Sequence, residues 1–326
     1  MNIFRIVKLK FTSPLHLGKG VGDAYDTSER LLHSDTLSGA VVSTLLLTNP
    51  AADAPEFMAK YRISSAFPYM GTSFFLPKPA VRSSIRIDDS DDYGQKKKVK
   101  KIEYIESSLW QDLVKGNELN ISSGMLSKNG KFLFCDKAPK ELPYTDLVQQ
   151  RVLVPRAGGD SKPYYLERRY FHEDAGLYFF LNTDAETADQ ILALLNILGD
   201  TGLGTDKSVG NGQFECGLSE LELNLPEDTG KSMLLSLACP LKEETDSDML
   251  RKSSYQLVQR GGFISGTSRD EFRHLRKKSI YMFTEGSVIS RGKLEGKIEN
   301  LRPEWNDHLL HPVWRDGRAF VVPVNL

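Results

Sequence analysis

The sequence GDTGLGTDKSVGNG, residues 199–212, is the stretch on which the interpretation of this chain depends. It has five glycines in fourteen positions and joins a segment with helical periodicity to a segment with strand periodicity. Glycine-rich loops beside a helix often bind phosphate, because their backbone amides can approach it closely. The stretch therefore has to be compared with the known nucleotide-binding motifs.

A P-loop is excluded by spacing and by order. Gly199 and Gly204 have the required separation, but Thr205 and Asp206 stand between Gly204 and the Lys207-Ser208 pair. The predicted helix also precedes the loop, whereas a P-loop opens a helix whose N-terminus faces the phosphate.

A dinucleotide fingerprint is excluded as well. Its third glycine position is Lys207 in this loop and Asp23 in the run GKGVG at 18–22. What remains is a loop in which free amides, the Thr205 and Ser208 hydroxyls and the Lys207 ammonium follow a sugar-phosphate backbone. A flexible surface turn is the alternative.

Strand patterns occur at four places around this loop. The run IVKLKF at 6–11 alternates apolar and charged residues, and GLYFFLN at 176–182 is a continuous apolar run. Punctuated strand-like runs follow Pro50, and QFECGLSELEL at 213–223 resumes an extended pattern after the loop.

Two helices are predicted between these strands. The first begins at Ser34 or Asp35, which is best interpreted as a cap, and the second has Thr183 and Glu186 in capping-box spacing and ends at Gly199. Each helix has an apolar face, formed by Leu37, Ala40, Val41, Thr44 and Leu45 in the first and by Ala188, Ile191, Leu192, Leu195 and Leu198 in the second.

The order strand, helix, strands, strand, helix, strand predicts an α+β fold of the ferredoxin-like type, with helices on one face of an antiparallel sheet. We expect residues 1–225 to form this domain, with an insertion at about 77–170. In the insertion, the acidic and lysine runs at 88–101 indicate a solvated hairpin or a mobile excursion. Residues 226–230 are a linker, and 231–326 form a smaller β-rich domain with four strand-like runs, at 231–240, 254–264, 279–289 and 317–324.

The overall charge is nearly balanced, with 42 Lys and Arg against 43 Asp and Glu, so any anion site must be local. Two stretches are locally basic: 251–278, which contains RGGF, and 151–170, where arginines alternate with tyrosines. Basic groups beside aromatic rings suit single-stranded RNA, although a solvated basic face would look the same.

No metal or cofactor is expected. The cysteines Cys135, Cys216 and Cys239 are too far apart for a zinc or redox motif, and no histidine pair has metal-ligand spacing. The N-terminus lacks the pattern of a signal peptide, and no apolar run reaches the ~20 residues of a membrane span. We expect a cytoplasmic protein with no membrane partner.

Four stretches together carry a resemblance: LHLGKG after the first strand, LLHSDTLSGAV at the first helix, the glycine loop continued to QFE, and HPVWRDGRAFVVPV near the C-terminus. They resemble the RAMP superfamily of CRISPR-associated proteins, and the set of four is most similar to subunit four of the type III-A Csm effector complex. The resemblance runs from the first strand to the last.

This resemblance implies two ferredoxin-like (RRM-like) domains and a non-catalytic subunit for antiviral defence. It implies binding of the repeat-derived 5′ tag of the crRNA and docking between the backbone RAMP subunit and the large polymerase/cyclase-type subunit. The RNA-binding residues that it implies are His16, Gly18, Lys19, Gly202, Gly204, Thr205, Lys207, Ser208, Gly210 and Gly212. Charge and glycine context add Arg151, Arg156 and Arg260. The aromatic signature of an ordinary RRM is missing, so we expect recognition through loops.

Three alternatives stay open. A metal-independent crRNA-processing endoribonuclease would use His16, His33 or His172 as an acid-base group. A protein-interaction subunit without RNA contact would leave the glycine loop unexplained. The type III-B counterpart of the subunit would share the fold and the role.

Overall fold

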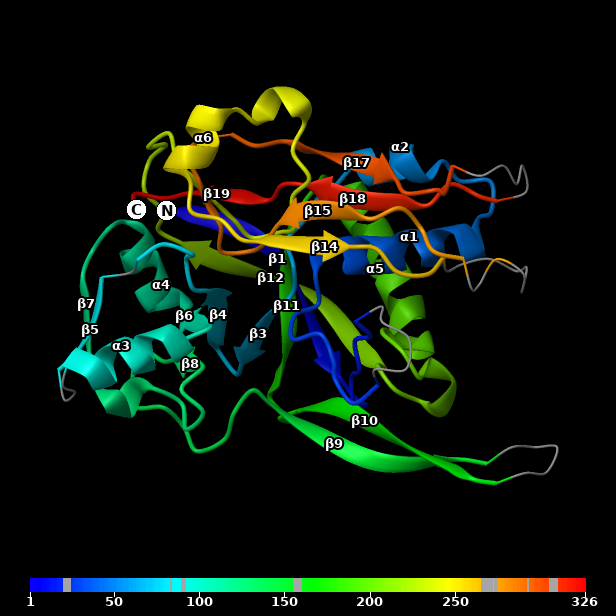
Figure 1. Ribbon diagram of the computed structural model, residues 1–326, viewed down its shortest axis with the longest axis horizontal. Coiled ribbons are helices and arrows are strands. Elements are labelled where there is room, and N and C mark those ends of the chain that lie inside the picture. The colour runs from blue at the N-terminus through cyan, green and yellow to red at the C-terminus, as the bar shows by residue number, and fades with distance from the viewer. Residues whose placement is uncertain are drawn as a thin grey trace.

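The computed structural model describes residues 1–19, 25–82, 84–88, 92–154, 160–264, 272, 275–291, 293–304 and 310–326. At its centre, four strands of a larger sheet lie beside two helices (Figure 1). In chain order these elements are β1 (Asn2–Phe11), α1 (Ser34–Thr48), β3 (Phe67–Met70), β11 (Ala175–Asn182), α5 (Ala185–Thr201) and β12 (Phe214–Leu223). The strands lie in the order β12-β1-β11-β3 with every neighbouring pair antiparallel. This order confirms the predicted α+β fold of the ferredoxin-like type.

Both faces of this sheet are covered, which explains the continuous apolar run in β11. The cross-strand pair Val7 and Phe179 belongs to the core under α1 and α5, whereas Ile6 and Phe180 belong to a second core on the other face. A sheet with one solvated face would alternate apolar and polar residues. In β11, by contrast, every residue from Ala175 to Leu181 is buried.

The start of α5 differs from the predicted capping box. The N-cap is Asp184, whose carboxylate accepts from the Thr187 amide at 2.8 Å and from its hydroxyl at 3.0 Å. Asp is a stronger N-cap residue than Thr. Because Asp184 directly follows Thr183, the sequence pattern alone does not show which of the two residues caps the helix.

The end of α5 also lies beyond the predicted residue, because the helix continues to Thr201. Gly199 is inside the helix, and a Cβ at this position would lie 2.2 Å from the carbonyl oxygen of Phe214. Gly199 does not end the helix; because it lacks a Cβ, it allows α5 to pack closely on β12.

The predicted insertion is built onto the edge of the sheet. Strands β4 (Ser73–Pro77), β6 (Tyr104–Glu106) and β8 (Phe132–Leu133) extend the sheet beyond β3, with α4 (Ser107–Val114) beside them. Strands β5 (Ile85–Ile87) and β7 (Leu119–Ile121) form a separate parallel pair. Strands β9 (Tyr144–Leu153) and β10 (Lys162–Phe171) form a two-stranded ribbon that projects from the body (Figure 1).

The lysine run is helical: α3 spans Asp92–Lys101, so the expected hairpin or mobile excursion is wrong for these residues. Lysine is a good helix former, and Lys98, Lys100 and Lys101 lie in the last turn, where the helix dipole favours positive charge. Two small elements complete this half, α2 (Ala54–Ala59) and β2 (Arg62–Ile63), which pairs with β11.

The C-terminal part is β-rich. Its elements are β13 (Ser232–Leu234), α6 (Ser247–Lys252), β14 (Leu257–Arg260), β15 (Ile280–Phe283), β16 (Val288–Ile289), β17 (Gly296–Asn300), β18 (Trp314–Arg318) and β19 (Val321–Pro323). They form a sheet of order β16-β13-β19 and the hairpin pairs β14-β15 and β17-β18. The four predicted strand-like runs contain β13, β14, β15 with β16, and β19. The fourth run also includes the last two residues of β18, whereas β17 lies outside all four.

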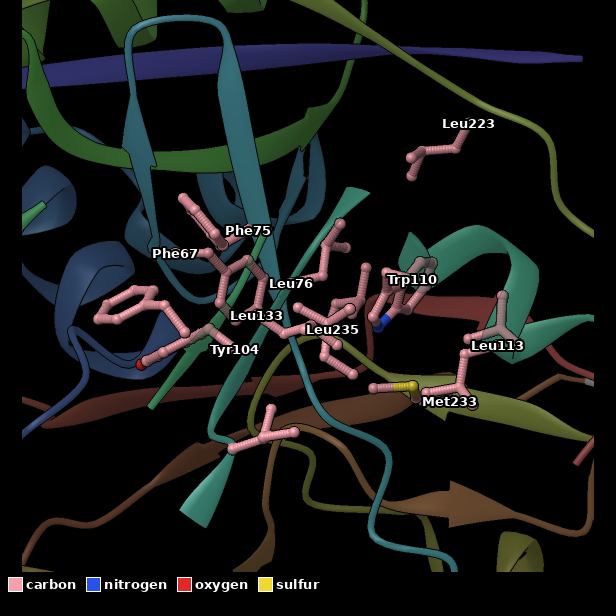
Figure 2. Packing of buried hydrophobic residues seen from close by; sticks show 14 of the residues in the cluster. Phe67, Phe75, Leu76, Tyr104, Trp110, Leu113, Leu133, Leu223, Met233 and Leu235 are labelled. Atoms are coloured by element: carbon pink, nitrogen blue, oxygen red, sulfur yellow. The ribbon is translucent and has the colours of Figure 1, made fainter. Parts of the chain in front are cut away.

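The two halves share one hydrophobic core. Met233 and Leu235 of the C-terminal part pack in the same cluster as Trp110 and Leu133 of the N-terminal part (Figure 2). Phe320 packs against Phe180 with ring centroids 5.6 Å apart and the ring planes tilted by 33°. The second face of the central sheet is therefore covered by residues from both ends of the chain.

Candidate nucleic-acid interface

The glycine loop follows α5 and leads into β12. Gly202 caps the helix, with φ +85° and its amide donating to the Leu198 carbonyl at 2.7 Å. A short 3₁₀ turn spans Lys207–Val209, preceded by Asp206 in the left-handed region at φ 58°. Positive φ angles also occur at Gly204, Gly210 and Gly212. The backbone of the loop thus depends on residues without a Cβ.

Three of these glycines are required by close backbone packing as well as by φ, and at Gly202 a Cβ would lie 2.4 Å from the carbonyl oxygen of Asn211. A Cβ at Gly204 would lie 2.2 Å from the carbonyl oxygen of His16, and one at Gly212 would lie 1.9 Å from that of Leu203. At Gly210 nothing lies within 4 Å of the same position. The loop is folded tightly at its base, and its tip carries the open glycine.

The base of the loop is hydrogen-bonded to the segment that follows β1. The Thr205 amide donates to the His16 carbonyl at 3.0 Å, and the Gly212 amide donates to the Pro14 carbonyl at 2.8 Å. A Cβ at Gly18 would come 3.1 Å from Cγ2 of Thr205. The structure therefore brings His16 and Gly18 together with the glycine loop.

The tip of the loop is exposed and basic. Lys207, Ser208 and Gly210 are exposed, as is Lys19 in the segment after His16. Partial desolvation by surrounding atoms lowers the pKa of Lys207. Within the described ranges, no acidic side chain forms an ion pair with Lys19 or Lys207. These two ammonium groups are available to an anionic strand.

His16 is held beneath this surface. Its residue is 1 % exposed, and Nδ1 lies 2.6 Å from the carbonyl oxygen of Glu167 in β10. Arg168 follows Glu167 in β10 and donates to the side-chain oxygen of Asn211 at 3.2 Å. The ribbon therefore contacts both the segment after β1 and the glycine loop. Asn211 is 2 % exposed and was not predicted from the sequence, since a single asparagine in a glycine-rich run gives no pattern.

Three arginines of the basic stretch 151–170 differ in their surroundings. Arg151 lies half-buried in β9, opposite Tyr164 of β10. Arg156 lies outside the described residues. Arg169 is buried and binds both carboxylate oxygens of Asp146, at 2.8 and 3.1 Å, so it stabilises the base of the ribbon.

Arg260 lies in a different network from the glycine loop. Its guanidinium donates to the two oxygens of Asp35 at 2.9 and 3.1 Å and to the Thr36 hydroxyl at 2.9 Å. Arg315 of β18 binds the same carboxylate. Burial would raise the pKa of Asp35, but the Arg315 and Arg260 guanidinium groups outweigh it and hold this pKa well below its ordinary value.

Asp35 is therefore the centre of an ion-pair network, and the expected cap role of Ser34-Asp35 is wrong. The N-cap of α1 is His33, which makes no side-chain cap bond. Ser34 instead donates its amide to the Ser65 hydroxyl at 2.8 Å. The network joins the first turn of α1 to β14 and β18 of the C-terminal part.

The other two candidate histidines lie in separate surroundings. Nδ1 of His33 is 2.8 Å from the Glu285 carboxylate. Burial lowers the pKa of His33, but Glu285 outweighs this and the net shift is upward. His172 accepts at 3.4 Å from the Asp174 amide. The described residues contain no group of three or more His, Cys, Asp and Glu side chains arranged to hold a metal ion.

Comparison with known proteins gives the class. The model of the RAMP superfamily matches residues 8–215, more than half of the chain, and the chain belongs to this superfamily. The CRISPR Csm4 C-terminal domain model matches residues 227–324. Among the described residues, every helix is too short or too polar to span a membrane.

Within the superfamily the chain is similar to Csm4. It is 27% identical over 304 residues to the CRISPR system Cms protein Csm4 of Thermococcus onnurineus (strain NA1), covering 90% of this chain and 91% of the relative. A chain of the Csm1-Csm4 cassette in complex with cA4 has the same fold, with a TM-score of 0.64, 23% identity and coverage of 100% and 99%. A chain of the Csm3-Csm4 subcomplex of a type III-A CRISPR-Cas interference complex has a TM-score of 0.62 at 20% identity, with both chains covered completely.

Proposed function

We propose that this chain is the crRNA-binding subunit four of a type III-A Csm effector complex, with no catalytic role of its own. In this role it holds the repeat-derived 5′ tag of the crRNA. The observation that carries the proposal is the joint construction of the glycine loop and the segment after β1. Direct backbone hydrogen bonds fix the two loops to each other, while Lys19, Lys207 and Ser208 stay exposed.

The chemistry of this surface suits a phosphodiester backbone. Exposed amides and unpaired ammonium groups bind phosphate oxygens with little dependence on the base. The 5′ tag is a single strand, and such strands are bound through phosphate contacts and accessible sugars. The proposed RNA-binding set keeps His16, Gly18, Lys19, Arg151 and Lys207, together with Gly202, Gly204, Thr205, Ser208, Gly210 and Gly212. Arg156 and Arg260 remain the weaker members, since Arg260 is already bound to Asp35.

The proposed partners follow from the relatives. The similar structures are of Csm1-Csm4 and Csm3-Csm4 assemblies. We therefore expect this chain to link a backbone RAMP subunit to the large polymerase/cyclase-type subunit, in the cytoplasm. The type III-B counterpart differs from this proposal in its partners, so identification of the co-purifying subunits decides between the two.

We also propose the domain division 1–225 and 231–326, the second being a reduced ferredoxin-like domain. The sheet order β16-β13-β19 supports this, because it matches the third, first and last strands of the ferredoxin-like order. The helix after β13 is the short α6.

A salt titration tests the RNA contact. The 5′-tag RNA of the host repeat is bound to the full chain with its co-purified partners, and the dissociation constant is measured across salt concentrations. Lys207→Ala is expected to weaken binding and to reduce the salt slope by about 0.7, the value for one phosphate contact on a single strand. Lys242→Ala, an exposed lysine of the C-terminal part, is the matched control. An unchanged slope in Lys207→Ala contradicts the proposed role of the loop.

The endoribonuclease alternative has one observation in its favour: Nε2 of His16 has no hydrogen-bond partner. A general base needs such a free acceptor. Incubation of the chain with repeat RNA in a metal chelator tests this alternative. Cleavage that is lost in His16→Ala would replace the scaffold proposal, whereas intact RNA supports it.

A further inference from the structure

Three buried polar atoms without partners lie around the base of the glycine loop. They are Nε2 of His16, Oγ1 of Thr205 and Nε of Arg168. Among the described residues only one other buried side-chain nitrogen or oxygen lacks a partner, Nε2 of His311. A buried polar group that lacks a partner costs about 1–3 kcal/mol, so native proteins rarely keep several in one place without a ligand or water.

The three residues belong to one hydrogen-bonded network. The Thr205 amide donates to the His16 carbonyl at 3.0 Å, and the His16 ring lies 2.6 Å from the carbonyl oxygen of Glu167, the residue before Arg168. Arg168 in turn donates at 3.2 Å to Asn211 on the same loop. The network thus joins the segment after β1, strand β10 and the glycine loop.

The hydrogen bond to Glu167 sets the chemistry of the His16 ring. A carbonyl oxygen can only accept, so Nδ1 carries the hydrogen, and in the neutral ring Nε2 is an acceptor. Nε of Arg168 is a donor, and the Thr205 hydroxyl can donate or accept. A group that satisfies these atoms must donate one hydrogen bond and accept others. A hydroxyl does so, whereas a phosphodiester oxygen has no hydrogen to give to Nε2.

We propose that this network binds a ribose 2′-hydroxyl of single-stranded RNA and so distinguishes RNA from DNA. The hydroxyl hydrogen is donated to Nε2 of His16, and its oxygen accepts from Thr205 and Arg168. The proposal rests on the proposed function and gives the loop a second role, because Lys19 and Lys207 bind phosphates while the network recognises the sugar. The 2′-hydroxyl is the group by which a protein recognises RNA at a given site.

The glycine at position 18 supports this placement. Gly18 is exposed and lies over the Thr205 side chain, where a Cβ would approach Cγ2 to 3.1 Å. A larger side chain at this position would cover the network from the side of solvent.

The test is a double-mutant cycle between the protein and the oligonucleotide. The full chain, with its co-purified partners, is titrated with 5′-tag RNA and with a series of the same RNA in which one ribose at a time is 2′-deoxy. In the wild type, one position is expected to lose at least about 10-fold in affinity, because its hydroxyl makes two neutral hydrogen bonds and one to the charged guanidinium of Arg168. Thr205→Val, which keeps the shape and removes the hydroxyl, is expected to shrink that loss, while Thr205→Ser keeps it.

Controls separate the possible failures. Thr48→Val removes an exposed hydroxyl on α1 and is expected to leave the 2′-deoxy effect unchanged. Tight RNA binding with no sensitive ribose would overturn the inference, because a water molecule would then satisfy the three atoms, and the proposed function would stand. Equal affinity for an all-DNA tag and for the RNA tag would likewise overturn the inference and leave the proposed function standing. Absence of RNA binding by the assembled complex would overturn the proposed function itself.

Discussion

The glycine loop and the first turn of α1 are both rich in charged and hydrogen-bonding groups, but the two regions satisfy those groups in opposite ways. Around Asp35 the charges are paired inside the protein: Arg260 and Arg315 share one buried carboxylate. Around Thr205 the lysines have no acidic partner in the described chain, and three buried polar atoms have none at all. The first region is an internal clamp, and the second has bonding capacity left for a ligand.

The comparison also separates two kinds of motif. The stretches LLHSDTLSGAV and HPVWRDGRAFVVPV carry the family resemblance as strongly as the glycine loop. In the structure they meet at Asp35, Arg315 and the Ser38–Asp316 hydrogen bond of 3.0 Å, so they hold α1 against β18. The residues of a family motif can therefore form the contact between two halves of a chain instead of a binding surface.

The largest expected effect is at the clamp. Asp35→Asn removes the carboxylate that Arg260 and Arg315 share and leaves Arg260 with its longer ion pair to Glu29, at 3.7 Å. Breaking a buried ion pair costs about 3–5 kcal/mol. We expect a loss of this size in the free energy of unfolding, measured by urea denaturation at pH 7.

The pH dependence of this loss follows from the lowered pKa of Asp35. The carboxylate's contribution to stability is complete above its unfolded pKa, about 3.9, and is lost as the pH falls toward the folded value. The gap between wild type and Asp35→Asn is therefore expected to close below about pH 4. A gap that does not change with pH would contradict the ion-pair interpretation.

An intermediate effect is expected at the base of the glycine loop. Gly212→Ala places a Cβ 1.9 Å from the Leu203 carbonyl oxygen at a φ of +76°, and we expect a loss of about 2–4 kcal/mol with weaker tag binding. Gly210→Ala is the matched variant, because its φ is +80° but its Cβ position is open; it should cost only about 1 kcal/mol. Equal losses in the two variants, measured by thermal unfolding, would show that the base of the loop is not tightly packed.

The smallest effect is expected at His33. Its pKa is raised by Glu285 in spite of burial, so its contribution is complete below the unfolded pKa of about 6.5 and is lost as the pH rises through the folded value. His33→Gln should cost about 1 kcal/mol at pH 6 and less at pH 9. His172→Gln, a change outside this network, reports the effect of losing a histidine elsewhere. If the loss of unfolding free energy in His33→Gln grew with pH, the interpretation that His33 stabilises the fold in its protonated form would be wrong.

The central fold could be predicted because its elements follow simple periods. β11 is a buried run of the right length for a strand, and α5 has an apolar stripe with polar residues before it. The order of these elements and their type, strand or helix, could therefore be predicted from the sequence. Exact ends could not be predicted, since Gly199 looks like a helix terminator until Phe214 is seen packed against it. α3 was missed because charge runs were weighed above the helix propensity of lysine.

The candidate site was predicted in part, and the limit is long-range pairing. Periodicity cannot tell that Arg260 meets Asp35, 225 positions away in sequence, so a basic residue in an RGGF context was placed with the RNA-binding set. The hydrogen bond between the Thr205 amide and the His16 carbonyl was not predicted either, since no local pattern indicates it. The unpartnered atoms of His16 and Arg168 are visible only in three dimensions.

The core shared by the two ends of the chain has a consequence for synthesis. Ile6 and Phe180 of the central sheet pack in the same cluster as Phe320, Val322 and Val324, which are synthesised long after the first strand. Until then one apolar face of the first strand stays uncovered in the nascent chain. Native folding of the central sheet therefore cannot finish before β19 has been synthesised, and a stop codon that removes β19 should yield aggregated protein, not a stable N-terminal half.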